Sequence, residues 1–139
     1  MKSEGTRRLS PRDILIQSLW VGLGGCLGAN TRYWVGVWIQ GRWGTAFPWA
    51  TLLINVTGSL VLGFLAAWLP GRFGSAEHAV RLALPVGFVG AYTTFSTYEL
   101  ELLHLGQQRA WWLAALYALG SVILGFGAVQ VGGWLGRRI

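Results

Sequence analysis

Residues Gly87–Tyr98 read G-F-V-G-A-Y-T-T-F-S-T-Y, within an apolar stretch that is long enough to cross a membrane. Two glycines, three threonines, a serine and four aromatic residues stand where a lipid-facing helix would carry Leu, Ile and Val. A bilayer core offers no water to unpaired N–H and C=O groups, so non-helical backbone survives there only when it is buried in protein or lines a cavity. We therefore predict a broken helix at this run and expect the functional site beside the break.

The composition of the chain is that of an integral membrane protein. Of its 139 residues, 53% are hydrophobic and 12% are charged, which is far from the balance of a soluble domain. Apolar segments that reach the roughly 20 residues needed to cross a bilayer lie at 14–39, 48–69, 80–103 and 111–135. We predict one all-α, multi-pass domain over residues 1–139, with four transmembrane helices, the third of them broken in mid-membrane. Residues 1–13 form a basic tail in front of a first span that is retained rather than cleaved.

The distribution of positive charge indicates how the chain sits in a membrane. The formal net charge is +6, but the arginines lie in termini and loops, where they set topology, so we expect no nucleic-acid partner. With four spans, both termini lie on one side. That side collects Lys2, Arg7, Arg8, Arg12, Arg72, Arg137 and Arg138, whereas the other side has Arg42 and Arg109. The bias favours cytoplasmic termini, and it becomes weak when the N-terminal tail is left out.

Glycine is abundant, with 21 residues, and small residues four apart let helix backbones approach closely in lipid. Such pairs are Gly24 with Gly28, Ser59 with Gly63, and Gly132 with Gly136. Contacts within one subunit account for most of them. Four helices are still too few to surround a hydrated ion path, so we expect an oligomer, most simply a two-fold dimer.

Polar side chains lie inside two of the predicted spans. In span 48–69, one helical face carries Thr51, Asn55, Gly58 and Ser59. The Asn55 amide either ties helices together or donates its two N–H groups to an anion, and the spacing leaves both interpretations open. In span 111–135, Tyr117 and Ser121 are four residues apart. Their hydroxyls either pass a small ion along or hydrogen-bond a neighbouring helix.

Three charged residues are candidates for a vestibule. Arg32 lies about two-thirds of the way along the first span, where it could attract anions, bond to carbonyls at a helix C-terminus or reach the interface. Glu99 and Glu101 lie near the end of the third span. Either both mark the interface, or one of them lines a vestibule and influences entry.

The predicted break would expose backbone groups in mid-membrane. The half-helices Arg81–Val86 and Phe95–Leu103 would present opposite dipole ends there. The carbonyl groups of Gly90 and Thr93 would then be available to a hard cation such as Na⁺.

Phe95 and Tyr98, which follow the break, are three residues apart and project from one helical face. The edge of an aromatic ring carries the positive part of its quadrupole and can contact an anion; core packing is the alternative role. Ser96 and Thr97, between the rings, add hydroxyls to this predicted anion pathway.

Catalytic and proton-coupled functions find no support in the sequence. His78 and His104 lie at segment edges, without the Cys or acidic neighbours of a metal site, and no nucleophile–base set accompanies them. We therefore expect no enzyme. A small multidrug-type transporter would need a carboxylate inside a span, and the interiors of spans one, two and four hold none. Passive permeation or a structural role is favoured.

The runs Gly24–Tyr33, Thr51–Ser59 and Gly87–Tyr98 together resemble the Fluc (CrcB-type) fluoride channel family, and the resemblance covers all four predicted spans. It implies a fluoride-selective channel in a prokaryotic inner (plasma) membrane, which lets F⁻ leave the cytoplasm passively and so reduces fluoride toxicity. It also implies a dual-topology homodimer of antiparallel copies, with two fluoride pathways and a structural Na⁺ at the dimer centre. The implied partners are fluoride, membrane lipid and a second copy of the chain.

The resemblance also assigns roles to residues. It implies that the backbone carbonyls of Gly90 and Thr93 bind the Na⁺, and that Asn55 is the pore amide. It further implies Phe95 as the first pore aromatic, Tyr117 and Ser121 as the hydroxyl track, and Glu101 as the vestibule acid.

Tyr98 departs from the family pattern, because the second pore aromatic is typically Phe. Its added hydroxyl could hydrogen-bond fluoride or fill the path. Some members of the family work as paired, non-identical subunits. Together with the basic tail, Tyr98 keeps a second hypothesis open, a non-conducting or orientation-fixed partner subunit of a heterodimeric channel.

Overall fold

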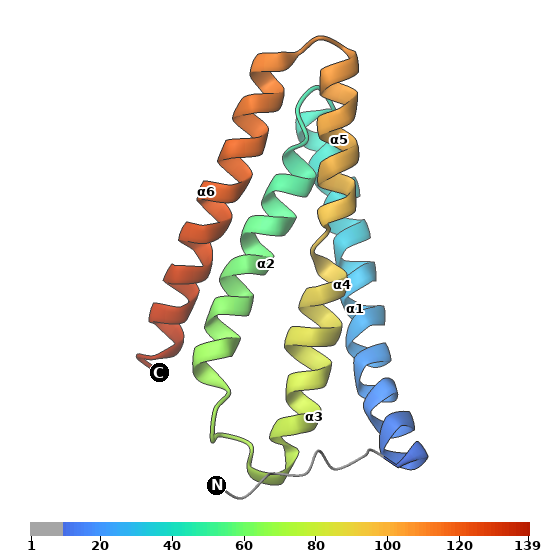
Figure 1. Cartoon of the computed structure of the whole chain (residues 1–139), viewed down its shortest axis with the longest axis vertical. Coiled ribbons are helices and arrows are strands. Elements are labelled where there is room, and N and C mark those ends of the chain that lie inside the picture. The colour runs from blue at the N-terminus through green and yellow to red at the C-terminus, as the bar shows by residue number, and fades with distance from the viewer. Residues whose placement is uncertain (1–9) are drawn as a thin grey trace, which may run out of the picture.

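A computed structural model describes residues 10–139, and over that range the chain is helical without strands (Figure 1). Lys2, Arg7 and Arg8 of the predicted basic tail lie outside the described residues. The elements, in chain order, are α1 (Pro11–Trp43), α2 (Trp49–Trp68), the 3-10 turn η1 (Gly74–Ala76), α3 (Glu77–Arg81), the π-helical segment η2 (Leu82–Val89), α4 (Gly90–Tyr92), α5 (Phe95–Gln107) and α6 (Trp111–Gly136). The predicted all-α class is confirmed.

Within the described residues, three helices are long and apolar enough to cross a membrane, namely α1, α2 and α6. The segment from α3 to α5 is interrupted, so the count of four spans remains a prediction. The helix α1 is longer than the span 14–39 at both ends. It begins at Pro11 because Ser10 and Asp13 form a reciprocal capping box, so the last residues of the predicted tail are helical.

The break in the third segment is shorter than the sequence suggested. We expected the first half-helix to end at Val86, and this was wrong, because the chain stays helical through Tyr92 and only Thr93 and Thr94 are extended. Pro85 lies in η2, where the wider π-helical turns accommodate a ring that lacks an N–H. Figure 1 shows α4 and α5 end to end with a short link between them.

Gly87, which we read as a helix breaker, serves in packing instead. A Cβ on Gly87 would lie 2.6 Å from the carbonyl oxygen of Val21, so this glycine lets η2 press against α1. Gly24 and Gly28 on α1 make the same kind of approach, since a Cβ on either would overlap a backbone carbonyl, of Ala83 and Phe88 respectively.

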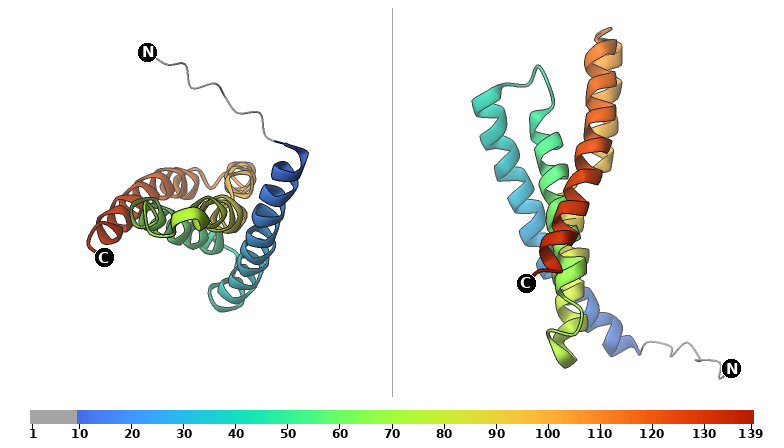
Figure 2. Two further views of the ribbon diagram at one scale, coloured as in Figure 1. Left: turned by 90° about the horizontal axis from the view of Figure 1, so that it is seen from below. Right: turned by 90° about the vertical axis from the view of Figure 1, so that its left-hand side faces the viewer.

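The helices α2 and α6 run side by side in the same direction (Figures 1 and 2). A Cβ on Gly63 would overlap the carbonyl of Val129, and one on Gly132 would overlap the carbonyl of Leu60. Most of the small pairs seen in the sequence are therefore used inside one chain. Figure 1 shows α6, α2, α4 and α1 in that order across the molecule, so the broken segment lies between α1 and the α2–α6 pair.

The loop before the broken segment is held by Glu77. Its carboxylate accepts hydrogen bonds from the Gly71 N–H (2.7 Å) and the Arg81 Nε (2.9 Å). The Arg81 hydrogen bond, supported by that of Gly71, lowers the pKa of Glu77. A carboxyl whose pKa is lowered in the folded state stays ionised to lower pH, so this contact persists below the ordinary titration range of Glu.

Candidate functional site

Asn55 on α2 replaces the helical hydrogen bonds that are missing at the break. Its Oδ1 accepts the Thr94 N–H at 2.8 Å, and its Nδ2 donates to the Thr94 carbonyl at 3.0 Å. Thr94 in turn caps α5, because its Oγ1 accepts the Thr97 N–H. The structure therefore shows Asn55 tying two helices together. One N–H of its amide takes no part in this pair, so the donor role that the sequence left open is still available.

The Gly90 carbonyl loses its regular partner as a result. In a continuous helix it would accept the N–H of Thr94, four residues on, but that N–H bonds Asn55 instead. Gly90 is also exposed in the single chain. The sequence-based expectation of a freed carbonyl at this position thus has a definite structural origin.

The Thr93 carbonyl has a partner from α1. Arg32 donates from Nη1 to the Thr93 oxygen at 3.3 Å, and Thr93 is the C-terminal cap of α4, where a cation complements the helix dipole. Of the roles open to Arg32, the structure shows the bond to a helix C-terminus. No group of three His, Cys, Asp or Glu side chains in residues 10–139 could hold a metal ion.

A cavity of about 290 Å³ lies beside the break, and we call it the aromatic cavity. Its polar and aromatic lining residues are Asn55, Ser59, Thr93, Thr94, Phe95, Tyr98 and Ser121. The structure therefore brings together predicted pathway residues from α2, α5 and α6. The rings of Phe95 and Tyr98 lie 5.7 Å apart, and Phe95 is 71% exposed in the single chain.

Ser121 contributes a polar side chain to the wall of this cavity. Its Oγ is buried and is the one such side-chain atom in the described part of the chain without a hydrogen-bond partner. A buried hydroxyl without a partner costs roughly 1–3 kcal/mol. A ligand that accepts a hydrogen bond in the aromatic cavity would remove that cost.

The Tyr98 hydroxyl is directed toward α6, the helix that also carries Tyr117 and Ser121. It donates to the carbonyl of Ala118 on α6 at 3.3 Å. Its ring packs edge to face against that of Tyr117, with centroids 5.1 Å apart. The ring thus keeps a place in the cavity wall, while the hydroxyl links α5 to α6.

A second polar cluster follows along α5. Glu101 accepts hydrogen bonds from Thr51 Oγ1 (2.8 Å) and from Tyr117 Oη (2.7 Å), and the Tyr117 side chain is fully buried. The sequence pattern groups Thr51 with Asn55 and does not link it to Glu101. The two residues lie 50 positions apart, so no local pattern could have shown the pair.

The remaining predicted residues lie nearer the surface. Thr97 lines a cavity that also contains Arg32 and Glu101. Ser96 and Glu99 are exposed on α5, and neither lines this cavity or the aromatic cavity.

Membrane-length helices, a helix broken beside a cavity and neutral hydrogen-bond donors facing that cavity are the features of an ion-conducting membrane protein. The sequence matches, over residues 19–133, the family described as CrcB-like protein, Camphor Resistance (CrcB).

Several similar proteins carry the name fluoride-specific ion channel FluC. The protein of Acidobacterium capsulatum is 50% identical over 121 residues, which cover 87% of this chain and 96% of the relative. The protein of Trichormus variabilis is 44% identical over 117 residues, 84% of this chain and 85% of the relative. The protein of Koribacter versatilis is 45% identical over 121 residues, 87% and 95% respectively. The chain belongs to this CrcB (FluC) fluoride channel family, which is a family of ion channels and not of enzymes.

Proposed function

We propose that the protein is a fluoride-selective channel through which F⁻ leaves the cytoplasm passively, down its gradient. The observation that carries this proposal is the buried, unpartnered Ser121 hydroxyl in the aromatic cavity. Asn55 adds a free N–H, and Phe95 and Tyr98 add ring edges. All of these groups are neutral, so they can replace the water around a small anion without holding it too tightly to leave.

The segment α3–α5 is, in this proposal, the third of four spans in a prokaryotic inner membrane. The exposed Gly90 carbonyl and the exposed Phe95 ring then lie in mid-membrane. Lipid cannot satisfy a carbonyl there. A second, antiparallel copy of the chain would cover both groups and complete two pathways.

A structural Na⁺ at the centre of that dimer fits the donor set in part. The Gly90 carbonyl lacks its helical partner, and carbonyl oxygens suit a hard cation. The Thr93 carbonyl also accepts the Arg32 hydrogen bond, so a bound cation would share this oxygen with a guanidinium. Two copies would supply four carbonyls, and the ion would contribute positive charge between the ends of the half-helices.

Sodium is expected to raise the melting temperature of the detergent-solubilised protein, because a ligand of the folded dimer stabilises it. The measurement compares NaCl with N-methyl-D-glucamine chloride at equal ionic strength. Equal melting temperatures in the two salts would remove the Na⁺ site from the proposal.

Fluoride efflux from liposomes that contain only this protein tests the function directly. The wild-type protein is expected to release fluoride much faster than empty liposomes do, and to leave chloride inside. Phe95→Ile removes the ring edge while keeping an apolar side chain, so it is expected to abolish flux with the dimer intact on size exclusion. If liposomes with the wild-type protein release fluoride no faster than empty liposomes, the stand-alone channel is rejected. If Phe95→Ile conducts fluoride at the wild-type rate, the Phe95 ring does not belong to the pathway.

Replacement of Tyr98 by Phe should leave fluoride flux within about twofold of wild type. The variant retains the ring edge and gives up only the long 3.3 Å hydrogen bond to the Ala118 carbonyl. Efflux rates measured side by side in matched liposomes check this. A loss of flux as large as that of Phe95→Ile would mean that the Tyr98 hydroxyl contacts the ion.

A second candidate function is an orientation-fixed subunit of a heterodimeric channel. Charge favours it, because the start of α1, the segment from the end of α2 to α3 and the end of α6 lie at one end of the molecule (Figure 1) and carry Arg12, Arg72, Arg81, Arg137 and Arg138. The end of α1 and the α5–α6 loop lie at the other end and carry Arg42 and Arg109. With Lys2, Arg7 and Arg8 of the basic tail added, the bias is large enough to oppose insertion in both orientations. A neighbouring gene for a similar chain of opposite bias would support this candidate, and channel activity of the purified chain alone would reject it.

A further inference from the structure

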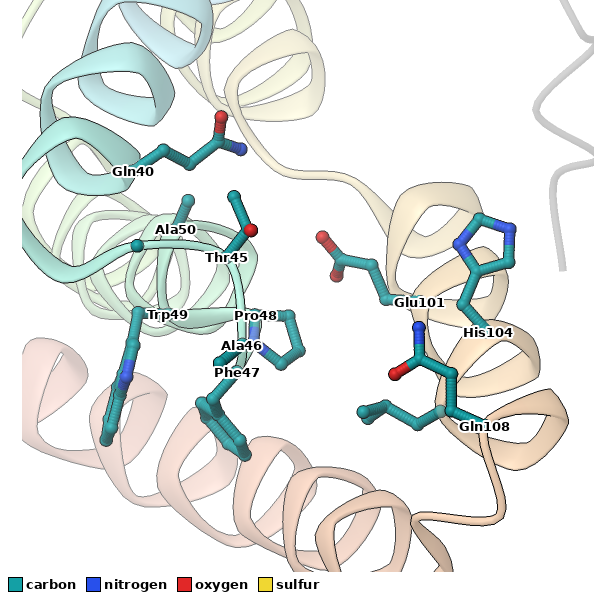
Figure 3. A pocket seen from close by; sticks show the side chains of 12 residues that line it. Gln40, Thr45, Ala46, Phe47, Pro48, Trp49, Ala50, Glu101, His104 and Gln108 are labelled. Carbon is teal, nitrogen blue, oxygen red and sulfur yellow. The ribbon is translucent and has the colours of Figure 1, made fainter.

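Beyond Glu101 the structure opens into a second polar cavity, which we call the outer cavity (Figure 3). Its volume is about 350 Å³, and it lies between the α1–α2 loop and α5. Figure 3 shows Gln40 reaching in from α1, Glu101 from α5 and Gln108 from the C-terminal end of α5. Amide and carboxylate side chains line this cavity, so it is polar although most of the chain is apolar.

The outer cavity belongs to a series of three. A cavity of about 290 Å³, which we call the inner cavity, holds Arg32, Thr94 and Thr97. The inner cavity shares Thr94 with the aromatic cavity, at its one end. It shares Gln40, Ala50 and Glu101 with the outer cavity, at its other end. These three shared residues therefore lie at the boundary between the inner and outer cavities, and we call this boundary the neck.

Only one of the neck residues can donate a hydrogen bond to an anion. Ala50 has no polar side-chain atom, and an ionised Glu101 is an acceptor only. The two oxygens of Glu101 are already engaged by Thr51 and Tyr117, but the carboxylate still repels a passing anion. Gln40 is exposed near the C-terminal end of α1, and its side-chain amide brings two N–H groups to the cavity wall without a hydrogen bond to residues 10–139.

We propose that the Gln40 side-chain amide binds the permeating fluoride at this neck and carries it past Glu101 into the outer cavity. The inference rests on the proposed channel function and adds a fluoride-contacting residue on α1. Its physical basis is the balance at the neck: N–H donors on one wall offset the repulsion from the carboxylate on the other.

The test measures fluoride efflux from liposomes for two variants of Gln40. Gln40→Leu keeps the approximate size and removes both donors, and it is expected to slow efflux by about tenfold, the value of one lost hydrogen bond to a charged group. Gln40→Glu keeps the shape and replaces the donors with a second carboxylate, so it is expected to slow efflux further. Gln107→Leu is the matched control, because Gln107 lies at the same end of the molecule on α5 and lines neither cavity.

One experiment separates the role of Gln40 from the channel function itself. Wild-type protein against empty liposomes tests the channel, and a wild type that does not conduct overturns both proposals. When the wild type conducts, the two Gln40 variants test the role of Gln40 alone. That role is overturned if Gln40→Leu or Gln40→Glu elutes like the wild type and releases fluoride at the wild-type rate. An equal loss in Gln107→Leu would also overturn it, because the effect would then not depend on the neck. If Gln40→Leu does not fold, Gln40→Glu decides the matter.

Discussion

Replacement of Asn55 by Asp is expected to abolish fluoride flux, with a loss of at least about a hundredfold. The change is nearly isosteric, but a carboxylate cannot donate to the Thr94 carbonyl, 3.0 Å away, and it brings a negative charge to the wall of the aromatic cavity. At an effective dielectric constant near 20, a unit charge about 4 Å from the ion costs about 4 kcal/mol. Efflux from liposomes measures the effect.

The control for this change is Asn30→Asp. Asn30 is also a helical amide, but its Nδ2 donates locally to the Cys26 carbonyl at 2.8 Å, and it lines neither the aromatic nor the inner cavity. Asn30→Asp also places a carboxylate in mid-span, so its yield of folded protein is expected to fall, but the flux per folded protein is expected to stay close to that of the wild type. If Asn55→Asp, folded and eluting normally, conducted as well as Asn30→Asp does, the Asn55 amide would have no contact with the permeating ion.

Replacement of Gly28 by Ala is expected to destabilise the chain by roughly 1–3 kcal/mol or more. The new Cβ would overlap the carbonyl oxygen of Phe88 and lie 2.9 Å from its carbonyl carbon, and neither backbone can move without opening the α1–η2 contact. The expected result is a lower melting temperature and a smaller monodisperse fraction after extraction in detergent.

Gly22→Ala on the same helix separates this steric effect from helix propensity. A Cβ on Gly22 has no atom within 4 Å, and Ala favours the helix over Gly by up to about 1 kcal/mol. The Gly22 variant is therefore expected to match or exceed the stability of the wild type. Equal behaviour of the two variants would show that the close approach at Gly28 is not needed for the fold.

Much of the architecture was predictable from local pattern. The lengths of apolar segments predicted α1, α2 and α6 to within a few residues, because a bilayer sets the length of a spanning helix. The run Gly87–Tyr98 predicted an interruption of the helix. Composition could not distinguish a glycine that breaks a helix from one that allows close helix packing. Gly87 allows close packing on α1, and the actual break falls at Thr93 and Thr94.

The candidate site was predictable as a set of residues and not as an arrangement. Asn55, Phe95, Tyr98 and Ser121 line one cavity, whereas Tyr117 bonds Glu101 and Ser96 lines neither this cavity nor the inner cavity. The direction of the Tyr98 hydroxyl depends on where α6 packs. The spacing of residues within α5 does not indicate how close the Tyr98 hydroxyl lies to the Ala118 carbonyl on α6.

The sequence by itself determined that this chain is helical, that it suits a membrane, that one helix is interrupted and that it belongs to a fluoride channel family. These properties follow from composition, from segment length and from contiguous motifs. Only the tertiary structure decided which groups are satisfied and which are free. The Asn55 amide hydrogen-bonds the backbone N–H and carbonyl of Thr94. Glu101 accepts hydrogen bonds from Thr51 and Tyr117, and the Ser121 hydroxyl has no partner in the described residues. The physical reason is that hydrogen bonds between helices act over a few ångströms between residues many positions apart, so they exist only once the helices have packed.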